Sequence, residues 1–246
     1  MSKIVIANWK MYGNFEYTND YLKTMCDAVF DTRLKLIVVP PFPYINLAYR
    51  QVVEHESEQI IIGAQNVAVG EGIRQTGELS AEMLVETGAK AVIIGHSERR
   101  SLGESDETIN QKMKYVVDSE LLPILCVGET KEEHDNVEKV LKNQITTALQ
   151  GIKNLETLVI GYEPIWAIGN GETADNDEIH DIAHRIREIA DGCCKIDNLF
   201  IVYGGSVNDK NIQEIINIDN IDGVFVGSYS LQMNEFCKTL EGLKIE

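Results

Sequence analysis

The chain has 246 residues, 44% of them hydrophobic, which is enough to bury a large core and is typical of an α/β barrel built as one domain. Its net charge of −17 would repel the phosphates of a nucleic acid and the surface of an anionic membrane, so we expect neither as a partner. An anionic ligand would need a local positively charged pocket.

The cysteines and the apolar runs bear on the compartment. Five cysteines are present, an odd number, and none forms a C-x-x-C pair or a zinc-type spacing. This pattern suits a reducing environment. The sequence opens directly into an apolar strand pattern, and no apolar run approaches the roughly 20 residues of a membrane helix. We therefore expect a cytoplasmic protein that is neither exported nor inserted in a membrane.

Eight short segments rich in β-branched residues recur along the chain, each nearly continuously apolar, as expected for parallel strands covered on both faces. They span residues 4–7, 36–39, 60–64, 91–95, 124–127, 158–162, 200–203 and 224–226. The stretches between them repeat apolar residues at helical spacing. Short polar residues that can cap backbone N–H groups precede three of the predicted helices: Ser80, Ser105 and Asp175.

This alternation of strands and helices indicates a parallel sheet of the α/β class. Eight repeats within this length favour a closed (β/α)8 barrel, in which an outer ring of helices surrounds eight parallel strands. An open doubly wound sheet is the structural alternative. No linker or low-complexity tract interrupts the series, so we expect a single barrel domain over residues 1–246.

Polar side chains stand at the ends of the first, fourth and sixth predicted strands. In such a barrel the C-terminal strand ends and the loops after them form the active site. The first strand runs into Asn8 and Lys10, the fourth into His96, and the sixth into Glu163. Together these residues suit an enolisation, which needs a base for a carbon-bound proton, a donor for the carbonyl oxygen and a cation for the developing oxyanion.

Each of these residues also has a structural interpretation. Glu163 could pair with an arginine, His96 could be a satisfied buried histidine, and Lys10 could be solvated. The stretch that begins at Pro164 favours function, because it is stiff and apolar at first and glycine-rich afterwards, as in a lid that excludes water. A short helix after His96 would place the ring at a helix N-terminus, which disfavours imidazolium and leaves a neutral donor.

The last two predicted strands run into glycine- and serine-rich loops, where barrels often bind phosphate through backbone N–H groups. Tyr203-Gly204-Gly205-Ser206 follows the seventh strand, and Gly227-Ser228 follows the eighth. Gly169 in the predicted lid would add a donor. A plain tight turn is the alternative interpretation of the glycine pair.

Three other patterns suggest different chemistry. His180 and His184 have nearly the spacing of a zinc-protease helix, but both fall outside its apolar arc, which indicates a solvated face. The segment Gly169-Asn170-Gly171 lacks the third glycine of a dinucleotide-binding loop and the lysine of a P-loop. Cys126 ends the fifth strand with no histidine tied to it, so we interpret it as a packed thiol near the site.

Four motifs, in order and at matching spacing, closely resemble the triosephosphate isomerase family, and the resemblance covers essentially the whole chain. They are Asn8–Met11, Gly95–Arg100, Tyr162–Gly169 and Tyr203–Val207. The resemblance implies interconversion of dihydroxyacetone phosphate and glyceraldehyde 3-phosphate with no cofactor and no metal.

The resemblance also implies the roles of individual residues. Glu163 would move a proton between adjacent carbons, neutral His96 would donate to the carbonyl oxygen, and Asn8 and Lys10 would stabilise the enediolate. The other implied roles are phosphate binding by Gly169, Gly205, Ser206, Gly227 and Ser228, and a supporting shell of Glu98, Cys126 and Tyr203. Family members are typically homodimers in which the loop around Thr76 enters the neighbouring subunit, so we expect a homodimer.

The sequence departs from the family pattern at three places. Ser228 and Tyr229 stand where a glycine and a small residue are usual, so a side chain occupies a position where backbone approaches phosphate. Glu172 replaces a lysine in the lid, and Arg74-Gln75 replaces an Ala-Phe pair before Thr76.

Two other functions remain open. One is a catalytically weak paralogue that only binds phosphorylated metabolites, an alternative that the departures at Ser228 and Tyr229 motivate. The other is a different phosphate-binding barrel enzyme, such as a lyase or aldolase that uses Lys10 as a Schiff-base amine.

Overall fold

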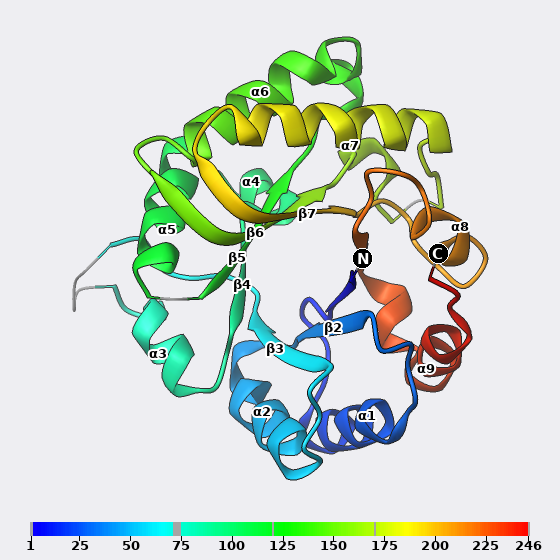
Figure 1. Ribbon diagram of the computed structural model, residues 1–246. Helices are drawn as coiled ribbons and strands as arrows, with labels where there is room; N and C mark the ends of the chain where they lie inside the picture. Colours follow the sequence, from blue (N-terminus) through cyan, green and yellow to red (C-terminus); the bar gives the residue numbers. More distant parts are fainter. Residues whose placement is uncertain (1, 71–74, 120, 170, 246) are drawn as a thin grey trace.

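The computed structural model describes residues 2–70, 75–119, 121–169 and 171–245, and its strands form a closed parallel barrel with helices around it (Figure 1). The strands are β1 Lys3–Asn8, β2 Leu34–Val39, β3 Ile60–Ala64, β4 Ala91–Ile94, β5 Leu122–Val127, β6 Asn154–Tyr162, β7 Lys195–Tyr203 and β8 Gly223–Val226. Each pairs with the next in sequence, and β8 pairs with β1 to close the ring. The predicted (β/α)8 barrel is confirmed.

The helices lie outside the barrel, and α6 and α7 run side by side along one flank (Figure 1). In the described part of the chain they are α1 Phe15–Asp27, α2 Ile45–Glu54, α3 Ala81–Glu86, α4 Ser97–Ser101, α5 Asp106–Asp118, α6 Val137–Ala148, α7 Asn176–Asp191, α8 Ile212–Ile215 and α9 Met233–Gly242, with short 3-10 helices η1 Phe42–Tyr44, η2 Lys131–Asn136, η3 Ile165–Ala167 and η4 Ser228–Leu231. The three predicted caps are confirmed: Ser80, Ser105 and Asp175 each accept the backbone N–H three residues later.

The period-2 alternation of the strands decides which side chains reach the site. In β6, Leu158 and Ile160 pack outward against the helices, whereas Val159 belongs to a separate cluster inside the barrel. Continuing that alternation places Glu163, the next residue after β6, on the inward side. The same rule brings Asn8 inward at the end of β1, after Ile6.

The barrel interior is filled by side chains and is not a pore. Below the site, residues contributed by strands around the ring form one buried cluster: Ile4, Ile6, Ile37, Val39, Ala91, Ile93, Ile124, Cys126, Val159, Val202 and Phe225. Full burial of one valine, isoleucine or phenylalanine side chain stabilises the fold by about 1.5–3 kcal/mol. The cluster therefore makes a rigid base for the residues above it.

Several strands begin before the apolar runs that predicted them, and β6 and β7 do so by the most residues. β6 begins at Asn154 and β7 at Lys195, about four residues before the apolar runs, and these early portions pair with each other from Asn154↔Lys195 onward. Their side chains are largely polar and exposed, so the apolar pattern could not reveal them. The difference lies at the N-terminal end of the barrel, away from the site.

Among the described helices, none combines the length and the apolar character needed to cross a bilayer. The assignment of residues 1–246 to one domain stays a prediction.

Candidate active site

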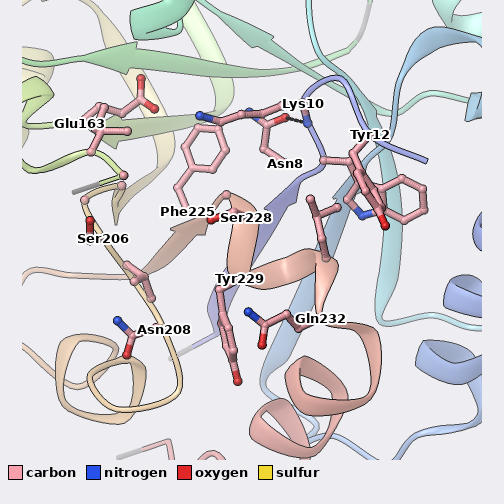
Figure 2. Close-up of a pocket in the computed structure, with 18 of the residues that line it drawn as sticks. Asn8, Lys10, Tyr12, Glu163, Ser206, Asn208, Phe225, Ser228, Tyr229 and Gln232 are labelled. Atoms are coloured by element: carbon pink, nitrogen blue, oxygen red, sulfur yellow. Dashed lines mark hydrogen bonds between the residues drawn. The ribbon is translucent and has the colours of Figure 1, made fainter. Parts of the chain in front are cut away.

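A pocket of about 500 Å³ opens at the C-terminal end of the barrel (Figure 2). Side chains from the ends of β1, β4 and β6 meet there with the loops that follow β7 and β8. All of the predicted catalytic and substrate-binding residues line it: Asn8, Lys10, His96, Glu163, Gly169, Gly205, Ser206, Gly227 and Ser228. The structure thus brings together residues that lie up to 220 positions apart in the sequence.

Glu163 is the buried carboxylate of this pocket, with 4% of its surface exposed. Its Oε1 lies 3.1 Å from Nε2 of His96, and its Oε2 accepts the backbone N–H of Ser97 at 3.1 Å. Burial alone raises the pKa of Glu163, but the imidazole, this N–H group and the Cys126 thiol outweigh burial, so the pKa lies below its ordinary value. Glu163 is therefore held as a carboxylate, the form a base requires.

His96 caps the N-terminus of α4, and its Nδ1 accepts the backbone N–H of Glu98 at 3.2 Å. This contact requires an unprotonated Nδ1, so a neutral ring would carry its proton on Nε2, which faces the pocket. Burial lowers the pKa of His96, but the facing Glu163 carboxylate more than offsets burial and the pKa is raised. The net shift is therefore opposite to the one predicted from the helix N-terminus, because Glu163 faces the ring.

Lys10 adopts a left-handed backbone conformation, with φ of 52°, which is uncommon for a residue with a side chain. Two side chains hold it there: Asn8 Oδ1 accepts the Lys10 N–H at 3.0 Å, and Gln65 Nε2 donates to the Lys10 carbonyl at 2.7 Å. Its Nζ pairs with Glu98 Oε1 at 2.7 Å. Among the described residues that line the pocket, Lys10 is the sole lysine or arginine, so it supplies the local cation that an anionic ligand needs.

The predicted lid is attached to the barrel at both ends. At its start, Trp166 Nε1 donates to Glu129 Oε1 at 2.8 Å, and at its end the Ala174 N–H donates to the Tyr203 hydroxyl at 3.1 Å. Between them, Ser206 Oγ donates to the Ala167 carbonyl at 2.7 Å. Asn170, which belongs to the same predicted lid, lies outside the described residues.

The glycine pair after β7 is more than a tight turn. A Cβ at Gly204 would come within 3.0 Å of Glu163 Cγ, and a Cβ at Gly205 would collide with the Tyr203 hydroxyl. Gly205 thus avoids a collision with Tyr203, and Gly204 avoids a tight contact with Glu163. With Ser206 and Ser228, this loop forms the side of the pocket predicted to bind phosphate (Figure 2).

Tyr229 does not block that loop. Its hydroxyl bonds to Thr239 Oγ1 at 2.7 Å, and its ring packs edge-on against Phe236 of α9, so the side chain turns away from Lys10 and Glu163 (Figure 2). Of the two departures after β8, only the Ser228 side chain stands beside the predicted phosphate position.

The residues predicted as a supporting shell surround the pocket. Glu98 is largely exposed and lies against Lys10 and His96, and Tyr203 anchors the lid. Cys126 is fully buried next to Glu163, and burial raises the pKa of its thiol, which disfavours a nucleophilic thiolate. Thr76 is exposed and does not line the pocket, and Arg74 lies outside the described residues.

Three residues with a role in the site had none in the sequence interpretation. Gln65 fixes the Lys10 backbone. Arg100 joins the ends of β4 and β5 by donating to the carbonyls of Gly95 and Cys126 at 2.8 and 3.1 Å. Phe225 forms the pocket floor, with its ring 6.0 Å from that of His96. Arg100 stands inside one of the motifs that resemble the family, Gln65 directly follows β3, and Phe225 follows only from strand alternation.

The histidine pair with zinc-like spacing, His180 and His184, does not line this pocket. His180 Nε2 contacts Asn220 Nδ2 at 3.1 Å, and His184 is exposed and pairs with Glu188 one turn later on α7. No group of three potential metal ligands occurs among the residues that the structure describes. Neither histidine is among the buried side chains of α7, but only His184 lies on a solvated face, because His180 is half-buried against Asn220.

The sequence profile of the triosephosphate isomerase family matches residues 3–243 of this chain. The triosephosphate isomerase of Alkaliphilus metalliredigens is 39% identical over 243 residues, which cover 95% of this chain and 96% of that protein. That of a Picosynechococcus species is 40% identical over 242 residues (97% and 98%), and that of Ruthia magnifica is 38% identical over 244 (96% and 97%). The matched region includes every pocket residue described above.

Proposed function

Because this chain belongs to the triosephosphate isomerase family, and so interconverts dihydroxyacetone phosphate and glyceraldehyde 3-phosphate, we propose that Glu163 and His96 perform the proton transfers. The reaction makes the chain an aldose–ketose isomerase of glycolysis. The observation that supports the assignment most strongly is the convergence of a buried carboxylate, an imidazole and one lysine in a single pocket.

Glu163 is the base in this proposal. Its carboxylate turns from His96 toward the substrate, takes a proton from one carbon and returns it to the adjacent carbon. The proton and the electron pair both stay within the enzyme–substrate complex, so no cofactor is needed. The depressed pKa of Glu163 supports the role, since the group is ionised and ready to accept a proton.

His96 is the electrophile that donates Nε2–H to the carbonyl oxygen. When Glu163 turns to the substrate, the charge that raises the pKa of His96 moves away, while the Glu98 N–H still donates to Nδ1. Movement of the base thereby favours the neutral imidazole at the moment when a neutral donor is required. The position of Glu163 and the protonation of His96 would therefore change together.

Asn8 and Lys10 stabilise the negative charge of the enediolate, and Lys10 also faces the phosphate. The strained backbone of Lys10 supports this role, because such strain persists where surrounding groups over-determine a functional geometry. Backbone N–H groups at Gly169, Gly205, Ser206, Gly227 and Ser228 would bind the phosphate. Closure of the lid over it would exclude water and protect the enediolate.

We further propose that the protein is a cytoplasmic homodimer. The arm around Thr76 is exposed here, and a second pocket lined by Asn8, Lys10, Gln65 and His96 opens beside the catalytic one. A neighbouring subunit's arm would fill that pocket and brace Lys10 and His96. Thr76 would then act on the partner's site and not on its own.

A coupled assay that follows consumption of glyceraldehyde 3-phosphate tests the assignment. Wild-type protein is expected to turn over at ordinary substrate concentration, and Glu163→Gln is expected to lose nearly all activity. Normal turnover would exclude the weak binding paralogue. Borohydride trapping of substrate on Lys10 would instead support a Schiff-base lyase or aldolase, and its absence counts against that alternative.

A further inference from the structure

His134 lies between two carboxylates at the base of the lid. It belongs to η2, and its Nδ1 is 3.3 Å from Glu129 Oε1 while its Nε2 is 3.6 Å from Glu178 Oε1 on α7. The ring also packs edge-on against Trp166, with the ring centroids 5.4 Å apart. The partly exposed imidazole of His134 therefore contacts both Trp166, near the start of the lid, and Glu129, the carboxylate that accepts the Trp166 indole N–H.

Glu129 is the residue through which His134 can act on the lid. Its side chain is fully buried, and its Oε1 is contacted by Trp166 Nε1 at 2.8 Å, by the Tyr162 hydroxyl at 3.2 Å and by His134. Among the described residues, none bonds to its Oε2. Three groups thus share one oxygen, which has two lone pairs.

The charged groups around the imidazole are mainly acidic. Glu178 faces it from α7, with Asp175 close to Glu178, and Glu129 faces it from the loop after β5. Tyr162 of β6 and Trp166 of η3 complete the contacts. On η2 itself, Lys131 is the cation, and the acids are Glu132, Glu133 and Asp135, of which Glu133 is engaged in the capping box with Thr130.

The number of N–H donors on His134 changes with its charge. An imidazolium has two N–H groups and can serve Glu129 and Glu178 together, whereas a neutral ring has one and can serve a single carboxylate. A buried carboxylate without a cation depends on its remaining hydrogen bonds, because an uncompensated buried charge is costly. Losing the imidazolium removes the positive charge beside Glu129, whichever nitrogen keeps its proton, and therefore makes the Trp166 bond to Glu129 harder to break.

We propose that His134 is a positioning residue for the lid, whose protonated ring pairs with Glu129 and frees Trp166 to move, and whose neutral ring leaves Trp166 held by Glu129. The inference rests on the proposed lid of the isomerase site. It adds a pH-dependent control of lid position through a residue that touches neither substrate nor Glu163. Histidine is suited to this, since its ring can carry either one or two N–H groups.

The indole N–H of Trp166 reports this state directly. The chain has two tryptophans, so a ¹⁵N-labelled protein gives two indole signals, and Trp166→Phe identifies which is which. In the wild-type protein, the Trp166 signal is expected to move downfield in one step as pH rises from 5 to 8, because its hydrogen bond strengthens. The signal of Trp9, which is fully buried after β1 and packs against Tyr17 and Tyr21 of α1, is expected to stay in place.

Two substitutions fix the opposite states. His134→Gln is neutral at all pH values and is expected to hold the Trp166 signal at its high-pH position, whereas His134→Arg keeps the charge and is expected to hold it at the low-pH position. His184→Gln, which removes an exposed histidine of α7, is the matched control and is expected to retain the step. kcat of the Arg variant is expected to exceed that of the Gln variant by about fivefold at pH 8, the effect of one ordinary hydrogen bond.

The inference would be overturned by a step that persists in both His134 variants, by the absence of a step in the wild-type protein, or by a step lost in His184→Gln. These readings do not depend on isomerase activity. An inactive protein that shows the step would contradict the proposed function and leave the titration of the lid base intact, so the two failures are distinguishable.

Discussion

Glu163 Oε1 and His96 Nε2 lie 3.1 Å apart, so the proposed base and the proposed electrophile contact each other in the empty pocket. Both are almost fully buried, and neither can act on substrate in this arrangement, because the carboxylate occupies the Nε2–H that a carbonyl oxygen would need. Substrate must therefore separate the pair.

Glu163→Gln removes the base and leaves the shape of the pocket nearly unchanged. We expect kcat to fall by about 10²- to 10⁴-fold, the usual contribution of general base catalysis. Steady-state kinetics in the coupled assay measure it. Glu156→Gln, at the exposed start of the same strand β6, is the control and should keep wild-type kcat. Retention of most activity by the Glu163 variant would contradict the mechanism.

The same substitution should lower the pKa of His96. The Glu163 carboxylate raises that pKa, so replacing it with an amide removes the contribution and lets burial dominate. ¹⁵N-histidine NMR across pH measures the shift. Glu98→Gln should have a smaller effect, since Glu98 is 3.7 Å from Nδ1 and more than half exposed. An unchanged His96 titration in the Glu163 variant would contradict the contact.

The Glu163–His96 pair also gives a pH dependence of unfolding. The raised pKa of His96 contributes stability that is complete below about pH 6.5 and is lost as pH rises through the folded-state pKa. The depressed pKa of Glu163 contributes stability that is complete above about pH 4.3 and is lost as pH falls through its folded-state pKa. Urea unfolding of wild type and Glu163→Gln should therefore differ most between these pH values.

Lys10→Met tests the cation of the pocket. We expect kcat/KM to fall by about 10²- to 10³-fold, because the enediolate and the phosphate lose their charged partner. Stability should change little, since the Lys10–Glu98 pair is partly exposed. Lys195→Met, at the opposite end of the barrel and 72% exposed, is the matched control. Equal kinetics for the two variants would rule out the proposed role of Lys10.

Tyr229→Phe separates folding from phosphate binding. The hydroxyl bonds to Thr239 and not toward the pocket, so we expect a loss of about 1 kcal/mol in unfolding free energy with KM unchanged. Thermal unfolding and kinetics provide the two measurements, and a double-mutant cycle with Thr239→Val isolates the bond. A shift in KM without a loss of stability would mean that Tyr229 reaches the substrate.

Sedimentation velocity tests the proposed homodimer. Wild-type protein should sediment as a dimer at micromolar concentration, and Thr76→Arg, which places a bulky charge on the arm, should sediment as a monomer with little activity. Thr76→Ser preserves a small hydroxyl and should remain an active dimer. A fully active Thr76→Arg monomer would show that the site is complete without a partner.

Much of the site follows from local patterns in the sequence. Strand alternation alone places Glu163 and Asn8 inside the barrel, and strand ends carry Lys10 and His96 to the same opening. The exposed early portions of β6 and β7 escaped prediction, because their polar residues lack an apolar period. Strand pairing, and not burial, extends them.

Contacts between distant side chains could not be predicted in the same way. The Glu163–His96 contact depends on the rotamer of Glu163, and the Glu129–His134–Trp166 arrangement depends on how η2 docks against the start of the lid. Residue spacing predicts neither the rotamer of a side chain nor the docking of η2. The raised pKa of His96 follows from the first contact, so it too required the structure.

The packed side chains beneath Phe225 make the pocket a dead end. Among the described residues, this cluster closes the barrel interior below the pocket, so reactant and product enter and leave through the same opening at the C-terminal end. The rates of substrate entry and product release through this opening therefore set an upper limit on the turnover rate, however fast the chemical step becomes.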